Sequence, residues 1–318
     1  MFTIRNANQT DESAILALGN NFELTPYMID KKFRNLTDVK VPLLVNTQFS
    51  NSKIKILVAC INQKVVGFIS FIVEKELSDY ISTTEEQYIS ILFLSVDEKY
   101  RKQGIATKLL KYCFEKWREQ DITIVRVGTD CGNTNALSLY QKQGFNIILN
   151  WNIYRIYKDD NKPFSQPLSF EQVDLHLKNF PVNILLKRAI PWFYDPKISQ
   201  NRLHRFLIEK NMLQIQNNNL QWIKRKVNNS ILSLTIKRDK AREEYYKIKG
   251  SLWTINDLFE SENRGQFLPE FINTTIRSLP NFAMVESWVC AHDHETQKIL
   301  LKTGMKFVYG GISLRREL

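Results

Sequence analysis

The alternation of hydrophobic and polar residues is clearest between residues 87 and 117, where it predicts a strand, a short turn and a helix. Residues Tyr88–Val96 are apolar and rich in β-branched and aromatic side chains, which favours a buried strand. Residues Ile105–Trp117 carry apolar side chains at spacings of three and four, which places them on one helix face. The residues between them are mostly polar and end in Gly104. This segment is the centre of the predicted fold.

The turn between this strand and this helix has the properties of an anion-binding site. The first N–H groups of a helix have no intrahelical acceptor, and the helix dipole adds partial positive charge there. Gly104 allows the backbone to approach a ligand closely, and Arg101 and Lys102 add two positive charges. We therefore expect a phosphate or pyrophosphate at this turn.

The same periodicities predict a mixed α/β domain in the first half of the chain. Strands are expected over residues 2–5, 55–60, 65–73, 88–96, 122–127, 145–149 and 153–157, and helices over 11–18, 105–117 and 135–143. Asp11 is the expected N-cap of the first helix. The polar residues that follow are typical of a linker, so the predicted limits are 1–158 for the first domain and 159–165 for the linker.

The order of elements in the first half is repeated, less distinctly, in residues 166–318. The predicted elements are a helix over 201–211, strands over 220–227, 231–238 and 245–253, a helix over 268–279, a strand over 283–291, a helix over 296–302 and a strand over 307–314. This repetition favours a second domain of the same kind, and an unrelated α/β domain is the alternative. The segment 263–266, at the place of the anion-binding turn, lacks the full pattern of residues 101–106. We do not expect this half to bind the same ligand.

Composition limits the classes of protein that fit. A length of 318 residues suits two domains, and the four scattered cysteines show no metal-binding spacing. We expect free thiols in the cytoplasm, no bound metal and no membrane span. The net charge of +11 fits either a basic solvated surface or an anionic ligand. A basic stretch with one aromatic, Trp222–Arg242, raises nucleic-acid binding as a further hypothesis, which we do not favour.

Two motifs in the first half resemble the GNAT superfamily, the GCN5-related N-acetyltransferases. Arg101-x-x-Gly104-x-Ala106 resembles the acyl-CoA signature of that family, and it lies between a strand and a helix as the family requires. The second motif is Asn133-x-x-Ala136-x-x-Leu139-Tyr140-x-Lys142-x-Gly144-Phe145. The resemblance covers residues 1–158 and implies the GNAT fold, an α/β (α+β) mixed sheet. It also suggests that residues 166–318 are a degenerate GNAT-like domain.

The resemblance implies that acetyl-CoA is held mainly by backbone groups. In GNAT proteins the central strand diverges from its neighbour and binds the pantetheine arm through main-chain groups, which here belong to Leu94, Ser95 and Val96. The pyrophosphate is expected on the residues of the turn and the first helical turn, Arg101, Lys102, Gln103, Gly104, Ile105, Ala106 and Thr107. From the residues alone, Leu94 and Val96 are equally typical of a strand core.

Two further residues receive roles from the resemblance. Asn133 resembles the family asparagine that contacts the CoA arm, and a helix cap is the alternative. Tyr140 matches the tyrosine near the CoA sulfur, where a phenol donates a proton to the leaving thiolate. The alternative for Tyr140 is that it only packs in the core.

The general base is not assigned by the resemblance. Ribosomal-protein-type GNAT enzymes place a glutamate where this chain has Gly128, and histone-type members place one where it has Ser90. The acceptor amine can instead lose its proton through water to Glu85, Glu86 or Asp130, or arrive neutral. The substrate class is left open for this reason.

The expected function is N-acetyl transfer from acetyl-CoA to a primary amine, by direct attack of the amine on the thioester. The acceptor is a small molecule or a protein, and a homodimer is left open. The alternative is a non-catalytic protein that binds or senses acyl-CoA, because neither glutamate position is filled.

Overall fold

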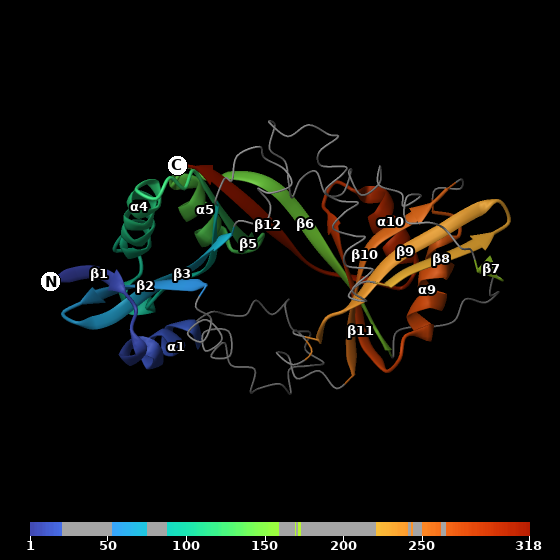
Figure 1. The fold of residues 1–318 in the computed structure, drawn as a ribbon, viewed down its shortest axis with the longest axis horizontal. Helices are drawn as coiled ribbons and strands as arrows, with labels where there is room; N and C mark the ends of the chain where they lie inside the picture. The colour runs from blue at the N-terminus through green and yellow to red at the C-terminus, as the bar shows by residue number, and fades with distance from the viewer. Residues whose placement is uncertain are drawn as a thin grey trace. The chain divides into compact units, whose positions relative to one another are not determined.

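The computed structural model divides the chain into two compact units. Unit 1 comprises Met1–Ile148 and Gly311–Leu318, and unit 2 comprises Leu149–Gly310 (Figure 1). The residues that the structure describes are 1–20, 53–74, 88–158, 169, 171–172, 221–240, 243, 250–261 and 265–318. The predicted linker, the predicted helix over 201–211 and the residues Glu85 and Glu86 lie outside these ranges.

The sheet of unit 1 has six strands in the order β1-β2-β3-β4-β5-β12. They are β1 (Phe2–Asn6), β2 (Ile54–Ile61), β3 (Lys64–Glu74), β4 (Tyr88–Val96), β5 (Ile124–Asp130) and the end of β12 (Lys306–Glu317). β4 and β5 are parallel, whereas the other neighbours are antiparallel. The mixed α/β fold predicted from the sequence is confirmed, and β4 has the predicted limits.

Helices cover both faces of this sheet. Alternate residues of β2 belong to two different clusters, with Leu57 in the cluster under α4 (Ile105–Arg118) and Val58 in the cluster under α1 (Glu12–Asn20). Figure 1 accordingly shows α4 and α1 on opposite sides of β2 and β3. α5 (Thr134–Lys142) contributes to the α4 cluster. The predicted apolar face of α4 is confirmed, because all six of its expected side chains are buried: Ile105, Leu109, Leu110, Cys113, Phe114 and Trp117.

The start of the first helical segment differs from the prediction. Asn8, not Asp11, is the N-cap, and a short 3-10 helix (Gln9–Asp11) precedes α1. The Asp11 carboxylate instead accepts from the Asn8 N–H at 2.9 Å and pairs with Arg5 at 2.6 Å. Asp11 still contributes to the start of the helix, but as the partner of the cap in a capping box.

The segment 146–157, predicted as two strands, forms one continuous strand, β6 (Asn146–Tyr157). Its residues Trp151–Tyr157 pair with β11 (Phe282–Cys290) in unit 2, while the end of β12 pairs with β5 in unit 1. Each unit is therefore completed by the last strand of the other half of the sequence. This exchange is why the compact units differ from the expected divisions at 1–158 and 166–318.

Unit 2 has the strand order β6-β11-β10-β9-β8-β7. Its elements are β7 (Glu171–Gln172), β8 (Gln221–Val227), β9 (Ser230–Arg238), β10 (Ser251–Glu260), α9 (Leu268–Ser278), β11 and α10 (His294–Lys302). β10 and β11 are parallel, as β4 and β5 are in unit 1. The predicted hairpin and the helices predicted over 268–279 and 296–302 are confirmed here. β10 covers the end of the strand expected over 245–253, whose residues 245–249 lie outside the described ranges.

The last elements of the two units repeat at a constant interval of 160 residues. β6 (146–157) corresponds to β12 (306–317), and α5 (134–142) corresponds to α10 (294–302). The N-caps Asn133 and Asp293 have nearly the same backbone angles, φ −84° and ψ 69° against φ −83° and ψ 69°. The strand registers also correspond. Trp151 pairs with Cys290 in unit 2, and the residues 160 positions away from these two, Gly311 and Asp130, pair with each other in unit 1.

Candidate functional site

The strands β4 and β5 separate part of the way along their length. β4 pairs with β3 over Tyr88–Val96 but with β5 only over Tyr88–Ile91. Beyond this point β5 continues to Asp130 and pairs only with β12. The β5 side of residues 92–96 therefore has no strand partner among the described residues. Unpaired backbone N–H and C=O groups at such a separation are available to a ligand.

A bulge bends β4 at the start of this open edge. Ser70 pairs with Phe93 and Phe71 with Ile91, which leaves Leu92 as an extra residue. The Leu92 side chain is 37% exposed. Bulges are common next to active sites because they redirect a strand. Leu92 was not predicted as a site residue, since an apolar residue in an apolar strand carries no signal of a bulge.

The end of β4 is held close to β3 by a glycine. A Cβ atom on Gly67 would lie 2.9 Å from the Ser95 carbonyl oxygen, so a larger residue would push the strands apart. The Ser95 hydroxyl donates to the Leu18 carbonyl at 3.2 Å, and the side chains of Leu94 and Val96 pack on the core. The side chains of these three predicted site residues thus point into the protein, which leaves the backbone for a ligand.

The turn after β4 has a defined backbone geometry. Lys102 and Gly104 have positive φ angles of 60° and 77°, and Gly104 is the N-cap of α4. The Arg101 Nε donates to the Val96 carbonyl at 3.1 Å, which ties the turn to the end of β4. No atom lies within 4 Å of the position that a Gly104 Cβ would take, so the space beside this residue is open.

Six consecutive backbone N–H groups in this turn have no acceptor among the described residues. Within the described part of the chain, no acceptor is found for the N–H groups of residues 102–107, and no side chain caps α4. The first helical bond is donated by Lys108 to the Gly104 carbonyl. Free donors at the positive end of a helix dipole are suited to binding an anion, which is the expectation that the sequence raised for this turn. The predicted residues Lys102, Gln103, Gly104, Ile105, Ala106 and Thr107 are brought together here.

The sequence that contains this strand edge and this helix N-terminus is similar to a known family. Residues 23–145 match the acetyltransferase (GNAT) family. This range, called the GNAT segment below, includes both sequence motifs.

Comparison with individual proteins supports the same fold. The uncharacterized protein YxbD of Bacillus subtilis is 29% identical over 86 residues, which is 27% of this chain and 46% of that relative. The chain thus matches about half the length of this curated protein. A GCN5-related N-acetyltransferase from Sphaerobacter thermophilus aligns with 99% of this chain and 95% of its own, with a TM-score of 0.55 and 13% identity. A GCN5-related glucosamine N-acetyltransferase region of a fungal β-N-acetylglucosaminidase has a TM-score of 0.58 and 13% identity, covering 99% of this chain and 38% of that one.

Tyr140 lies in the core of the GNAT segment. Its side chain is 6% exposed and its ring contacts Phe145 edge-on, with the centroids 5.5 Å apart. No partner for its hydroxyl is found among the residues described, and burial raises the pKa of this phenol well above its ordinary value. Tyr140 is therefore protonated at neutral pH, as a proton donor must be.

Asn133 has a structural task in the GNAT segment. It is the N-cap of α5, and its side-chain oxygen accepts from the Ala136 N–H at 3.1 Å. Asn133 thus caps α5, which is the alternative role given for it above. Its side-chain NH₂ group is not used by this bond.

The candidate positions for a general base differ in what they offer. Ser90 pairs with Arg126 in the last part of the β4–β5 ladder, and Gly128 follows that ladder with no atom within 4 Å of its Cβ position. The Asp130 Oδ1 accepts from the Gly132 N–H at 3.1 Å, while its Oδ2 is buried and has no partner. A buried carboxylate oxygen without a partner is costly, so it marks a place where a ligand or water supplies the bond.

The corresponding turn in unit 2 is already filled by a side chain. The Glu260 carboxylate, at the end of β10, accepts from the N–H groups of Gly265 at 2.8 Å and Phe267 at 3.4 Å. Glu260 is 6% exposed, and burial raises its pKa despite these bonds. The donors at the start of α9 are therefore occupied by an anion of the chain itself. This gives a physical reason for the expectation that unit 2 binds no acyl-CoA.

The remaining chemistry of the described residues is limited. They include no group of three or more side chains able to hold a metal ion, and no helix long and apolar enough to cross a membrane. Cys131 is exposed, whereas the thiols of Cys60, Cys113 and Cys290 are buried. In the basic hairpin, the Lys224 ammonium lies 4.6 Å from the Trp222 ring centroid, so these two groups interact with each other.

Proposed function

We propose that the chain is an N-acetyltransferase that transfers the acetyl group of acetyl-CoA to a primary amine. The observation that carries this proposal is the row of free N–H groups at 102–107 beside the open edge of β4. An acyl-CoA molecule needs both parts, one for its pyrophosphate and one for its pantetheine arm. The match of residues 23–145 to the GNAT family supports the same activity.

The chain would hold the donor mainly through its backbone. The N–H groups of the turn bind the pyrophosphate oxygens, and Arg101 and Lys102 add positive charge nearby. The open edge formed by Leu94, Ser95 and Val96 pairs with the amide groups of the pantetheine arm. The side-chain NH₂ group of Asn133 would contact the same arm.

The proposed reaction forms a C–N bond and breaks the C–S bond of the thioester. The acceptor nitrogen attacks the thioester carbonyl carbon, and a main-chain N–H group of β4 stabilises the oxyanion that develops. Asp130 Oδ2 accepts the proton that the amine loses, directly or through a water molecule. Tyr140 gives its phenolic proton to the departing thiolate, so that CoA leaves as a thiol.

We further propose that each chain binds one donor molecule. The repeat at 160 residues supports a degenerate GNAT-like domain in unit 2, and Glu260 occupies the place that a pyrophosphate would need. The second half of the sequence would then contribute the end of β12 to the sheet of unit 1 and bind no acyl-CoA.

The test is a survey of primary amines with acetyl-CoA, in which release of the CoA thiol is measured. Turnover with at least one amine, lost in Gly104→Trp and kept in Gly104→Ala, supports the proposal. Both variants carry the same positive φ, so only the bulk of the side chain distinguishes them.

A second candidate function is acyl-CoA binding without transfer. It is favoured by Ser90 and Gly128, which stand where related enzymes carry a glutamate. Saturable binding of acetyl-CoA without thiol release across the amine survey would select this function.

A further inference from the structure

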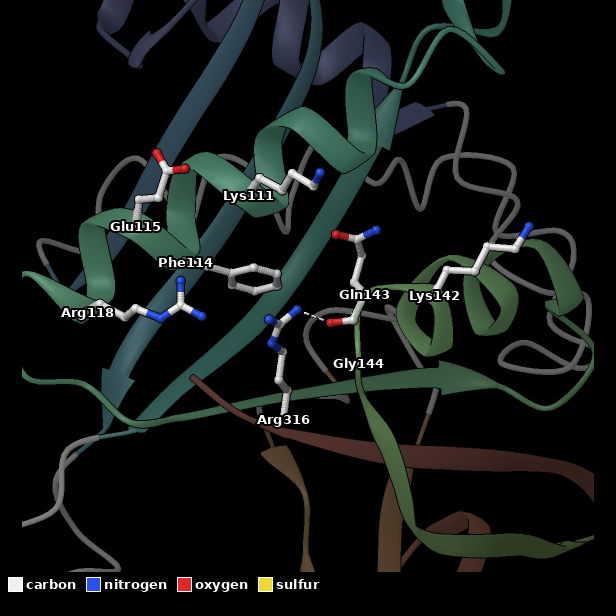
Figure 2. A pocket seen from close by; sticks show the side chains of 8 residues that line it. All are labelled: Lys111, Phe114, Glu115, Arg118, Lys142, Gln143, Gly144 and Arg316. Carbon is white, nitrogen blue, oxygen red and sulfur yellow. Dashed lines mark hydrogen bonds between the residues drawn. The ribbon is translucent and has the colours of Figure 1, made fainter.

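A basic hollow lies in unit 1 toward the C-terminal ends of α4 and α5, away from the turn at residues 102–107. Its volume is about 520 Å³, within the range of pockets that hold small molecules. It is lined mainly by Lys111, Phe114, Arg118, Gln143, Gly144 and Arg316 (Figure 2). Three of these side chains are cationic, and they come from α4 and from β12.

The positive charges of this hollow are not neutralised by neighbouring carboxylates. Figure 2 shows Arg118 and Arg316 extending toward the space beside Phe114, while Lys111 runs along α4 on the side of Gln143 and Glu115 and Lys142 extend away. Among the residues that the structure describes, none of these three cations has an ion-pair partner. Within the described ranges these three positive charges have no ion-pair partner, although Glu115 also lines the hollow.

Arg316 is held in a fixed position. Its guanidinium carbon lies 4.2 Å from the centroid of the Phe114 ring, and its Nη1 donates to the Gln143 carbonyl. Phe114 is 3% exposed, so the ring is a rigid support. The other N–H groups of Arg316 are not used by these contacts. A guanidinium that is already ordered loses little conformational entropy when it binds a ligand.

The two arginines are also close enough to repel each other. Burial, followed by the charge of Arg118, lowers the pKa of Arg316. Like charges that approach without a carboxylate between them are unfavourable, and an anion between them relieves this cost.

This hollow is separate from the proposed acyl-CoA site. α4 has 14 residues and rises about 1.5 Å per residue, so Arg118 lies about 20 Å along the helix from Gly104. The two sites are also separated along α5, because Asn133 of the proposed acyl-CoA site precedes its first residue and Gln143 of the hollow follows its last residue. The hollow therefore lies toward the other ends of both helices, with Lys111 in the middle of α4.

We propose that this hollow binds a small molecule that carries two or more phosphate charges. Guanidinium groups match the oxygens of a phosphate in paired hydrogen bonds, and Lys111 adds a further charge. Such an anion bridges β12 to α4 and to the end of α5. Because the end of β12 pairs with β5, the ligand also stabilises this edge of the sheet of unit 1.

The experiment is a calorimetric titration of inorganic pyrophosphate into the full chain saturated with CoA, which blocks the turn at 102–107. We expect one saturable site that weakens with added salt. Arg118→Gln should weaken it about tenfold or more, as expected for loss of a charged hydrogen bond. The matched control is Lys116→Gln, an exposed residue of the same helix that pairs with Glu119 and does not line the hollow. It should change the affinity by less than about twofold.

Three results would overturn the proposal: no saturable binding in the presence of CoA, equal weakening by both variants, or displacement of pyrophosphate by CoA. If the chain binds no CoA, the same titration is made with Gly104→Trp, in which the turn is blocked by a side chain. Binding in that variant keeps the second site even if the proposed transferase activity fails. Because Arg118 makes no contact that the fold requires among the described residues, its variant tests binding and not folding.

Discussion

Replacing Glu260 by alanine tests whether a carboxylate of the chain fills the turn in unit 2. The substitution leaves the N–H groups of Gly265 and Phe267 without their acceptor, and both residues are buried. Each buried donor that loses its partner costs about 1–3 kcal/mol. Relief of the unfavourable burial of the carboxylate offsets part of this cost. We expect unfolding of unit 2 to become easier by about 2–4 kcal/mol.

The assay is urea unfolding of the full chain, with and without sulfate at constant ionic strength. Sulfate should enter the vacated position and restore stability in Glu260→Ala, by about 2.7 kcal/mol at a concentration of 100 times its Kd. Glu260→Gln keeps one acceptor oxygen and should lose less stability than Glu260→Ala. The reasoning is refuted if Glu260→Ala is as stable as the natural chain, or if sulfate stabilises both proteins equally.

Four further predictions concern unit 1. Gly67→Ala should lower stability by about 1–3 kcal/mol in urea unfolding, because its Cβ would meet the Ser95 oxygen, whereas Gly128→Ala should not. Leu314→Ala should lower the free energy of unfolding by about 2–5 kcal/mol, since the Leu314 side chain is 0% exposed. Leu301→Ala is the control, because Leu301 is 52% exposed and its substitution should change the free energy of unfolding by less than about 0.5 kcal/mol. The hydrogen bond from Arg5 lowers the pKa of Asp11, so the ionised carboxylate stabilises the fold at neutral pH. This contribution is lost as the pH falls below about 4. The stabilities of Asp11→Asn and the natural chain should therefore converge in acid. Tyr140→Phe should lower turnover about a hundredfold with the affinity for acetyl-CoA unchanged; equal turnover would exclude the proton-donor role.

Local patterns were sufficient to predict the strand, turn and helix at the centre of the chain. The apolar face of α4 and the positive φ at Gly104 depend on neighbouring residues, which the sequence displays directly. The anion-binding turn was therefore predicted from residues 97–107 alone. The structure adds that its N–H groups have no acceptor in the described part of the chain.

Features that depend on distant residues were not predictable in this way. The segment around Trp151 resembles a turn in sequence, but it pairs with Cys290 in the middle of a continuous ladder. The bulge at Leu92 is defined only by its register against β3. Arg316 reaches Phe114 because β12 joins the sheet of unit 1, which no local pattern indicates. Glu260 offered no signal of this kind, because the strand predicted over 245–253 ends before it, and only the observed β10 places Glu260 at a strand end.

The most direct test of the central claim is a calorimetric titration of acetyl-CoA into the full chain, in which the number of sites is counted. The account predicts one site, retained in Gly104→Ala and lost in Gly104→Trp, while circular dichroism shows that both variants are folded. Two sites would contradict the role given to Glu260. No binding by the folded natural chain, or unchanged binding in folded Gly104→Trp, would contradict the acyl-CoA site at residues 102–107.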